Sequence, residues 1–200
     1  MTRDQLIQQA RQEIDSGALA ATLARRVAWR TESDLGADAT EASRAALHGY
    51  LSDEMSPVLR AMGFEVQILP NPVPGAGPFL LARRIEDPAA PTVLTYGHGD
   101  VVNGQKPQWR DGLDPWQLSI EGDRWYGRGT ADNKGQHSIN LSALAHTLQA
   151  RQQRLGYNLT VLLEMGEEAG SPGLAEFCQQ HREALRADLF LASDGPRVHA

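Results

Sequence analysis

The sequence is poor in cysteine and has no long hydrophobic run. Cys178 is the one cysteine among 200 residues, which excludes an internal disulfide framework and fits a reducing compartment. No apolar stretch is long enough to cross a bilayer, and the opening residues, MTRDQLIQQARQEID, are polar rather than typical of a signal peptide. We therefore expect a cytoplasmic location and no membrane partner.

Basic residues are also too few to indicate a nucleic-acid partner. The chain has 19 Lys and Arg against 25 Asp and Glu, a formal net charge of −6, and no basic run interleaved with aromatic residues. Neither G-x-G-x-x-G nor G-x-x-x-x-G-K-[ST] occurs, so no phosphate-binding loop is indicated. A hydrophobic share of 41% and a charged share of 22% are ordinary for one globular domain.

Hydrophobic patterning predicts strands that alternate with helices. Helical spacing covers residues 4–29 with a break near Ser16-Gly17, 41–62, 141–148 and 174–185. Strands are expected at 64–69 and 79–85, as a hairpin or as neighbours, and as short buried runs at 92–96, 159–163 and 189–192. This order predicts an α/β fold with three layers, αβα, around a mixed, mostly parallel sheet.

Acidic and imidazole residues follow each of the three short buried strands. They are His98 and Asp100 after the first, Glu167 and Glu168 after the second, and Asp194 after the third, with Asp132 in the glycine-flanked loop 127–135. In open α/β sheets, ligands bind beyond the carboxyl ends of the strands. Carboxylates and one imidazole that converge there suit a divalent metal of the zinc type.

The spacing of these residues favours separate roles. His98 and Asp100 are two residues apart, so in an extended chain they share a side, and the carboxylate can support the imidazole. Glu167 and Glu168 are adjacent and diverge, so one can bind metal while the other faces the attacking water. Asp132 could bridge two cations roughly 3.5–4 Å apart, an arrangement that lowers the pKa of a bound water and polarises an amide carbonyl.

Each feature alone has an ordinary structural interpretation. A lone histidine such as His98 is more often a hydrogen-bonded structural residue, Asp100 and Asp194 could cap helices, and adjacent glutamates are usually a solvated loop. Their joint occurrence at strand ends favours a metal site. Elsewhere, His137 has little supporting context, and tryptophans such as Trp109 and Trp116 could line a pocket or simply pack loops.

Five motifs in a fixed order carry a family resemblance. GHGDVV, DPW, YGRGTADNKGQ, EMGEEAGSPGL and ASDGP together resemble the aminoacylase/carboxypeptidase G superfamily of zinc metallopeptidases, which includes acetylornithine deacetylase, succinyl-diaminopimelate desuccinylase and cytosolic dipeptidases. The resemblance runs from about Thr92 to Pro196. DNKG and GSPGL look more like the dipeptidase branch than the deacetylases.

The resemblance implies a role for each candidate residue. His98 and Asp194 would bind a first metal, Glu168 a second, and Asp132 both. Glu167 would be the general base that takes a proton from the bridging water and later delivers it to the leaving amine, and Asp100 would orient His98. A cis peptide is implied at Asp132-Asn133. Two Zn²⁺ ions are expected, with Mn²⁺ or Co²⁺ as alternatives.

The implied activity is hydrolysis of the amide bond in dipeptides or related small N-acyl amino acids. An N-acyl-amino-acid deacylase and a non-catalytic metal-binding remnant stay open as alternatives. Family members continue into a lid or dimerisation domain and a returning segment with a last histidine ligand. We therefore expect residues 1–200 to be the N-terminal portion of a catalytic domain that is weak or inactive alone, with a homodimer open for the full-length protein.

Overall fold

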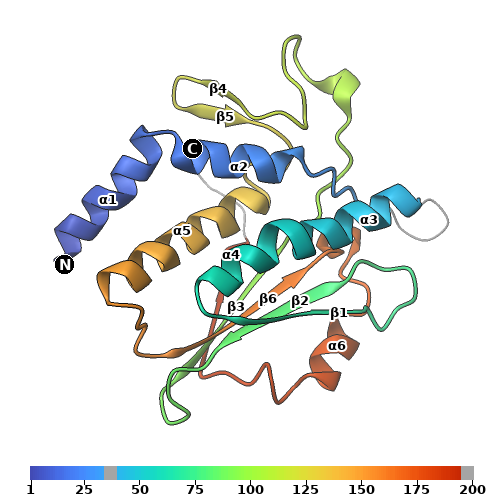
Figure 1. Cartoon of the computed structure of the whole chain (residues 1–200). Helices are drawn as coiled ribbons and strands as arrows, with labels where there is room; N and C mark the ends of the chain where they lie inside the picture. Colours follow the sequence, from blue (N-terminus) through green and yellow to red (C-terminus); the bar gives the residue numbers. More distant parts are fainter. Residues whose placement is uncertain (34–39, 195–200) are drawn as a thin grey trace.

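The structure, a computed structural model, describes residues 1–33 and 40–194 (Figure 1). Its helices are α1 (Arg3–Asp15), α2 (Ala18–Ala28), α3 (Glu41–Gly49), the π-helix η2 (Tyr50–Met55), α4 (Ser56–Ala61), the 3₁₀ turns η3 (Lys106–Gln108) and η4 (Glu167–Ala169), α5 (Lys134–Ala150) and α6 (Leu174–Gln180). Its strands are β1 (Glu65–Leu69), β2 (Phe79–Arg84), β3 (Thr92–His98), β4 (Ser119–Glu121), β5 (Arg124–Tyr126), β6 (Asn158–Glu164) and β7 (Leu189–Ala192).

Five strands form the central sheet in the order β1-β2-β6-β3-β7. β3 pairs in parallel with β6 and with β7, whereas β2 is antiparallel to both β1 and β6. Four strands therefore point the same way and β2 opposes them, which confirms the mixed, mostly parallel sheet. The register pairs His98 with Glu164, so the carboxyl ends of β3 and β6 lie side by side. Residues that follow these strands must meet at one edge of the sheet.

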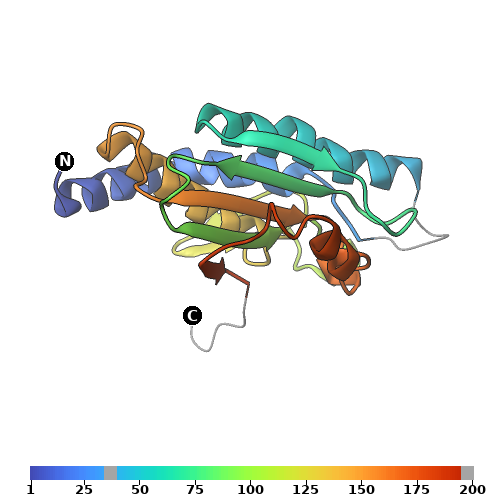
Figure 2. The ribbon, with the colours of Figure 1, turned by 90° about the horizontal axis from the view of Figure 1, so that it is seen from below.

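Helices cover both faces of this sheet, as the edge-on view in Figure 2 shows for α3, α4 and α6. On one face the continuous run α3-η2-α4 and helix α5 pack on the strands. The buried residues there are Leu47, Tyr50, Leu51, Met55, Leu59, Phe64, Leu80, Ala82, Leu141, Leu148, Leu155, Leu159, Val161, Leu163 and Met165. On the other face Phe177 of α6 stacks on Phe79, with ring centroids 4.1 Å apart. The predicted αβα layers are confirmed.

The N-terminal helices break where the sequence predicts. Gly17, between α1 and α2, has φ 78°, a left-handed conformation that glycine adopts without steric cost. Both helices pack on α5, and His146 Nε2 lies 2.8 Å from Glu13 Oε2 across the α1–α5 contact. Among the helices of the described residues, none is both long and apolar enough to traverse a bilayer.

The predicted helix 41–62 is continuous but changes its winding. The Thr40 hydroxyl accepts a hydrogen bond from the Ser43 N–H and caps its start. Residues 50–55 then adopt a π-helix before α4 resumes the ordinary winding. Single π-turns inside helices often occur near functional sites. Here the π-turn buries Tyr50 completely, and its ring lies beneath the loop that follows β3.

The long segment between β3 and α5 consists of loops, the 3₁₀ turn η3 and one small hairpin, β4–β5. Two tryptophans pack its first loop onto itself. The Trp109 indole N–H donates to the Gly104 carbonyl at 2.7 Å, and a Cβ at Gly104 would lie 2.6 Å from the Trp116 ring. Of the two roles left open for these residues, the structure shows loop packing.

The predicted burial is wrong for two of the three short strands, since residues 92–96 of β3 are only half-buried. Residues 189–192 do form a strand, but β7 is exposed rather than buried, with Leu189, Phe190 and Leu191 at 58%, 60% and 54% exposure. The physical reason is position. Within the described residues β7 is an edge strand that pairs only with β3. An apolar run predicts a strand that can be buried; it does not say what covers that strand.

Candidate metal centre

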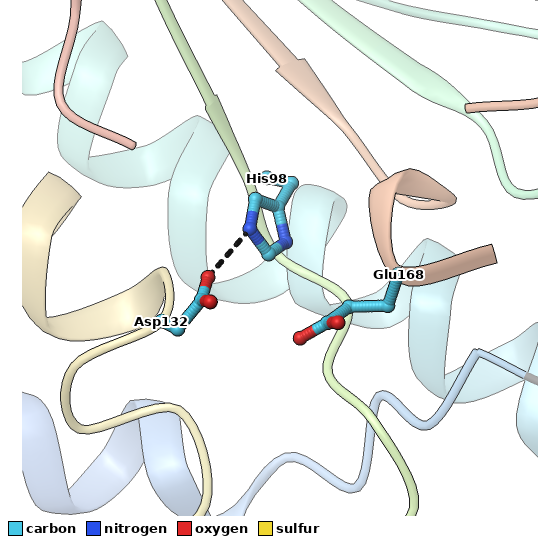
Figure 3. Close-up of side chains that lie close together, drawn as sticks. All are labelled: His98, Asp132 and Glu168. Atoms are coloured by element: carbon cyan, nitrogen blue, oxygen red, sulfur yellow. Dashed lines mark hydrogen bonds and ion pairs between the residues drawn. The ribbon is translucent and has the colours of Figure 1, made fainter. Parts of the chain in front are cut away.

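The predicted ligands do converge at the carboxyl edge of the sheet. His98 ends β3, Asp132 precedes α5, Glu167 and Glu168 begin η4, and Asp194 follows β7. Their ligand atoms form two triads, each within 4.8 Å: His98 with Asp132 and Glu168, and His98 with Glu167 and Asp194. Figure 3 shows the first triad, in which three elements far apart in sequence direct their side chains toward one another.

His98 is the centre of the cluster. Its side chain is 0% exposed, and Nε2 faces three carboxylates: Asp132 Oδ1 at 2.9 Å, Glu167 Oε2 at 3.7 Å and Asp194 Oδ1 at 3.9 Å. The opposite nitrogen, Nδ1, lies 3.0 Å from the Asp100 carbonyl oxygen and 3.3 Å from its carboxylate Oδ1. Nδ1 is thus held by Asp100, and Nε2 faces the carboxylates. Metal-binding histidines commonly have this arrangement, with one ring nitrogen hydrogen-bonded and the other free to bind the metal.

Asp100 connects two of the loops that carry ligands. It is 0% exposed, and its Oδ2 accepts hydrogen bonds from the Glu168 N–H at 3.0 Å and from the Ser33 hydroxyl. Its Oδ1 lies against His98 Nδ1 without hydrogen-bond geometry. The single carboxylate therefore holds both the imidazole and the backbone of the Glu168 loop. The sequence predicts the first contact, whereas the second and the partner Ser33 were missed.

Asn133 is a second connecting residue that the spacing did not reveal. Its side-chain oxygen accepts the His98 N–H at 3.3 Å, and its amide nitrogen donates to the Ser193 carbonyl at 2.9 Å and lies 3.4 Å from Asp194 Oδ1. The peptide bond between Asp132 and Asn133 is cis, as the resemblance implied. Asn133 is part of the DNKG motif, but the motif does not reveal which distant groups form hydrogen bonds with its side-chain amide.

Gly99, between the histidine and the aspartate, leaves no room for a larger side chain. A Cβ there would lie 2.6 Å from the Tyr50 ring and 2.7 Å from the Met165 sulfur. Such distances require the neighbouring side chains to move, because cores are packed without spare volume. Tyr50 and Met165, both buried beneath the loop, therefore favour glycine at this position.

The charges of the cluster shift the pKa values of its members. Burial alone would lower the pKa of His98, but the contact with Asp100 and the charges of Asp100, Asp132 and Glu167 raise it to about 9. Burial, followed by the neighbouring carboxylates, raises the pKa of Glu167, and burial together with Asp132 raises that of Glu168. The carboxylates repel one another and favour a cation among them.

A divalent cation fits this donor set. The ion pairs of Asp132, Glu167 and Asp194 within the described residues all go to His98 rather than to lysine or arginine. Lys134, two residues after Asp132, donates instead to the Trp29 carbonyl at 2.7 Å. Carboxylate oxygens from three loops and one imidazole nitrogen from the end of β3 are the kinds of ligand that zinc and similar ions take in proteins.

Fold and site together define an αβα protein with a candidate metal centre at the carboxyl ends of its parallel strands. Residues 94–199 match the sequence profile of Peptidase family M20/M25/M40. The match covers more than half of the chain and includes every candidate residue. The chain belongs to this family.

Curated relatives are similar over about half to two thirds of the chain. The mouse (Mus musculus) Beta-Ala-His dipeptidase is 41% identical over 126 residues, 62% of this chain and 24% of the relative. The Cysteinylglycine-S-conjugate dipeptidase of Corynebacterium striatum is 40% identical over 111 residues, 54% and 24% respectively. The succinyl-diaminopimelate desuccinylase of Gluconobacter oxydans is 38% identical over 112 residues, 56% and 28%. The matches thus span about a quarter of these relatives.

Solved structures share the fold over nearly the whole chain. Human carnosine dipeptidase 1 superposes with a TM-score of 0.82 and 27% identity, covering 98% of this chain and 41% of that one. The di-peptidase Dug1p of Saccharomyces cerevisiae superposes with a TM-score of 0.75 and 25% identity, covering 92% of this chain and 40% of that one. The αβα arrangement described above is therefore the one found in about two fifths of each of these dipeptidases.

Proposed function

We propose that this chain supplies metal-binding and catalytic residues to a two-metal hydrolase that cleaves the amide bond of dipeptides or related small N-acyl amino acids. The observation that carries the proposal is the convergence of carboxylates from three loops around the buried His98. Family membership and the dipeptidase names of two of the three relatives support the same reaction class.

In this proposal His98 and Asp194 would hold one Zn²⁺, Glu168 would hold a second, and Asp132 would contribute to both, with Mn²⁺ or Co²⁺ as alternative ions. Both triads contain His98, which supports its assignment as a ligand. The choice between the two glutamates rests on the backbone. The Glu168 N–H is tied to Asp100, so Glu168 stands on an anchored position that suits a ligand. Glu167 is left for proton transfer.

Each residue then has a chemical task. When bound, the divalent cations supply Lewis-acid activation of the amide carbonyl and of the attacking water. Glu167 would accept a proton from the attacking water at its carboxylate and pass that proton to the leaving amine. Asp100 keeps the His98 ring oriented, with Nε2 directed at the cluster.

Substitution of the adjacent glutamates tests these roles. Glu167→Ala is expected to retain bound metal and to lower turnover roughly 10²–10⁴-fold, the contribution of a general base. Glu168→Ala is expected to lower the metal stoichiometry, measured by elemental analysis beside the dipeptide assay. Glu176→Ala, on the exposed side of α6, is the matched control. Full turnover by the Glu167 variant, or full metal content in the Glu168 variant, contradicts the assignment.

A substrate panel separates the candidate activities. Hydrolysis of unblocked dipeptides supports a dipeptidase, which the DNKG and GSPGL motifs favour. Hydrolysis of acetyl or succinyl amino acids supports the deacylase, which the desuccinylase relative keeps as a second candidate. Metal binding without either activity in the full-length protein supports a metal-binding remnant. Weak turnover by residues 1–200 alone, and a homodimer of the full-length protein, stay predictions.

A further inference from the structure

A short segment from the N-terminal part of the chain runs beside the loop that carries His98 and Asp100. Glu32 and Val101 form a parallel bridge. The Val101 N–H donates to the Thr31 carbonyl at 2.9 Å, and the Ser33 N–H donates to the Val101 carbonyl at 3.0 Å. Residues 31–33 therefore extend the backbone pairing beyond the end of β3, along the loop that leads away from His98.

Three consecutive side chains of this segment each hold one point of that loop. The Thr31 hydroxyl donates to the Gly99 carbonyl at 2.6 Å, and Glu32 Oε1 accepts the Gly104 N–H at 2.7 Å. Both of these contacts restrain backbone. The third differs in kind, because the Ser33 hydroxyl donates to the Asp100 carboxylate, the group that contacts His98.

The contact with Ser33 matters because Asp100 is a buried charge. An ionised carboxylate without exposure is stable only where donors satisfy it. Asp100 Oδ2 has two such donors, the Ser33 hydroxyl and the Glu168 N–H, and Oδ1 faces the imidazole. Without the hydroxyl, this carboxylate would lose one of the groups that set its rotation, and the position of the His98 ring would be less restrained.

We propose that Ser33 is a positioning residue of the metal centre. Its hydroxyl orients the Asp100 carboxylate, and through Asp100 it holds the His98 imidazole and the backbone of Glu168 in the geometry that receives metal. The inference rests on the metal site of the proposed function and adds to it a residue 67 positions away from Asp100 in the chain.

The test uses a pair of variants that differ in the hydroxyl alone. Ser33→Val and Ser33→Thr have the same shape, and both suit an extended segment; Ser33→Ala is the third variant. Co²⁺ binding is followed by its visible absorption, and affinity by competition with a chelator. Ser33→Ala and Ser33→Val are expected to bind Co²⁺ about tenfold more weakly, the lower end of the effect of outer partners of metal ligands, with an altered spectrum. Ser33→Thr is expected to match the wild type.

The control is another serine that donates to a carboxylate. The Ser52 hydroxyl donates to Asp53 Oδ1 at 2.7 Å in η2, away from the cluster, so Ser52→Ala should leave cobalt affinity and spectrum unchanged. Equal affinity and spectrum for Ser33→Val and Ser33→Thr would overturn the inference, as would a tenfold loss in Ser52→Ala. Circular dichroism and thermal melts establish that each variant folds.

A measurement on the metal-free protein separates this inference from the proposed function. Amide hydrogen exchange at Glu168, whose N–H donates to Asp100, is expected to be faster in Ser33→Val than in Ser33→Thr or the wild type. If the wild type bound no cobalt, the proposed metal site would fail, and the exchange rates would still decide whether Ser33 orients Asp100. Equal exchange in the Val and Thr variants would reject that role.

Discussion

The two halves of the candidate metal centre differ in how they are built. His98 and Asp100 are 0% exposed, and hydrogen bonds and packed side chains hold them from beneath. The side chains of Asp132, Glu167 and Asp194 are 63%, 35% and 23% exposed and stand on loops at the open side of the cluster. One half is shaped by the core of the fold, and the other is directed toward solvent.

This contrast indicates how each half should respond to substitution. A change in the buried half alters the framework on which every ligand depends, because His98 belongs to both triads and Asp100 contacts both His98 and the Glu168 loop. A change in the open half removes one oxygen ligand and leaves the framework in place. Substitutions in the buried half should therefore weaken the binding of both metal ions, whereas substitutions in the open half should weaken the binding of one.

The largest difference is expected between His98→Gln and Asp194→Ala. The first variant should lose both metal ions, since both ligand triads contain His98, whereas the second should lose about one equivalent because the triad of His98, Asp132 and Glu168 remains. Elemental analysis of the purified protein gives the stoichiometry, and His48→Gln on the exposed surface of α3 serves as the control. If both variants lost the same amount of metal, the two halves would not differ as described.

A smaller effect is expected from Asp100→Asn, which preserves shape in the buried half. Asp100 Oδ2 accepts hydrogen bonds from the Glu168 N–H and the Ser33 hydroxyl, and Oδ1 lies against His98 Nδ1, so the amide nitrogen of Asn must oppose either those two donors or the His98 ring. Metal affinity should fall about 10–100-fold, as it does when the partner of a metal-binding histidine is changed. Asp53→Asn, exposed in η2, should leave affinity intact in the same cobalt competition assay.

The predicted ligands could be located from the sequence because parallel strands bring their carboxyl ends to one edge of the sheet. An apolar strand followed by His98 or by Glu167 is a local pattern, so the strand predicts where the side chain lies. Ser33 has no such pattern, since the polar stretch that contains it looks like a linker and its partner lies 67 positions further on. Buried hydrogen bonds between distant segments have no sequence period that would reveal them.

The exposure of β7 was unpredictable for a related reason. Apolar residues at 189–191 correctly indicate a strand, but burial depends on neighbours that the strand's own sequence does not specify. The helix break at Gly17 and the β1–β2 hairpin were predicted because they depend on residues within a few positions of one another. Features set by local chemistry were accessible to the sequence, and features set by long-range packing were not.

The smallest expected effect is on stability and comes from His137, a buried residue that contacts Asn133. Its Nε2 lies 2.6 Å from the Tyr50 hydroxyl, and its Nδ1 lies 3.4 Å from Asn133 Oδ1. Burial, followed by the positive charges of Arg26, His98 and Lys134, lowers the pKa of His137 well below 6.5. The folded protein therefore keeps this imidazole neutral, whereas in the unfolded chain it takes up a proton as the pH falls below about 6.5.

Stability must then decrease on the acid side. Above about pH 6.5 both states carry a neutral His137 and it adds no pH dependence; below that pH the unfolded state binds one more proton, and the free energy of unfolding falls by up to about 1.4 kcal/mol per pH unit. Urea unfolding is measured at pH 7.5, 6.5 and 5.5. The free energy of unfolding should fall less between pH 7.5 and 5.5 in His137→Gln than in the wild type, and as much in His48→Gln as in the wild type. If the pH dependence of the free energy of unfolding were the same in His137→Gln and the wild type, His137 would be protonated in the folded state. The prediction that it stays neutral beside Tyr50 and Asn133 would then be wrong.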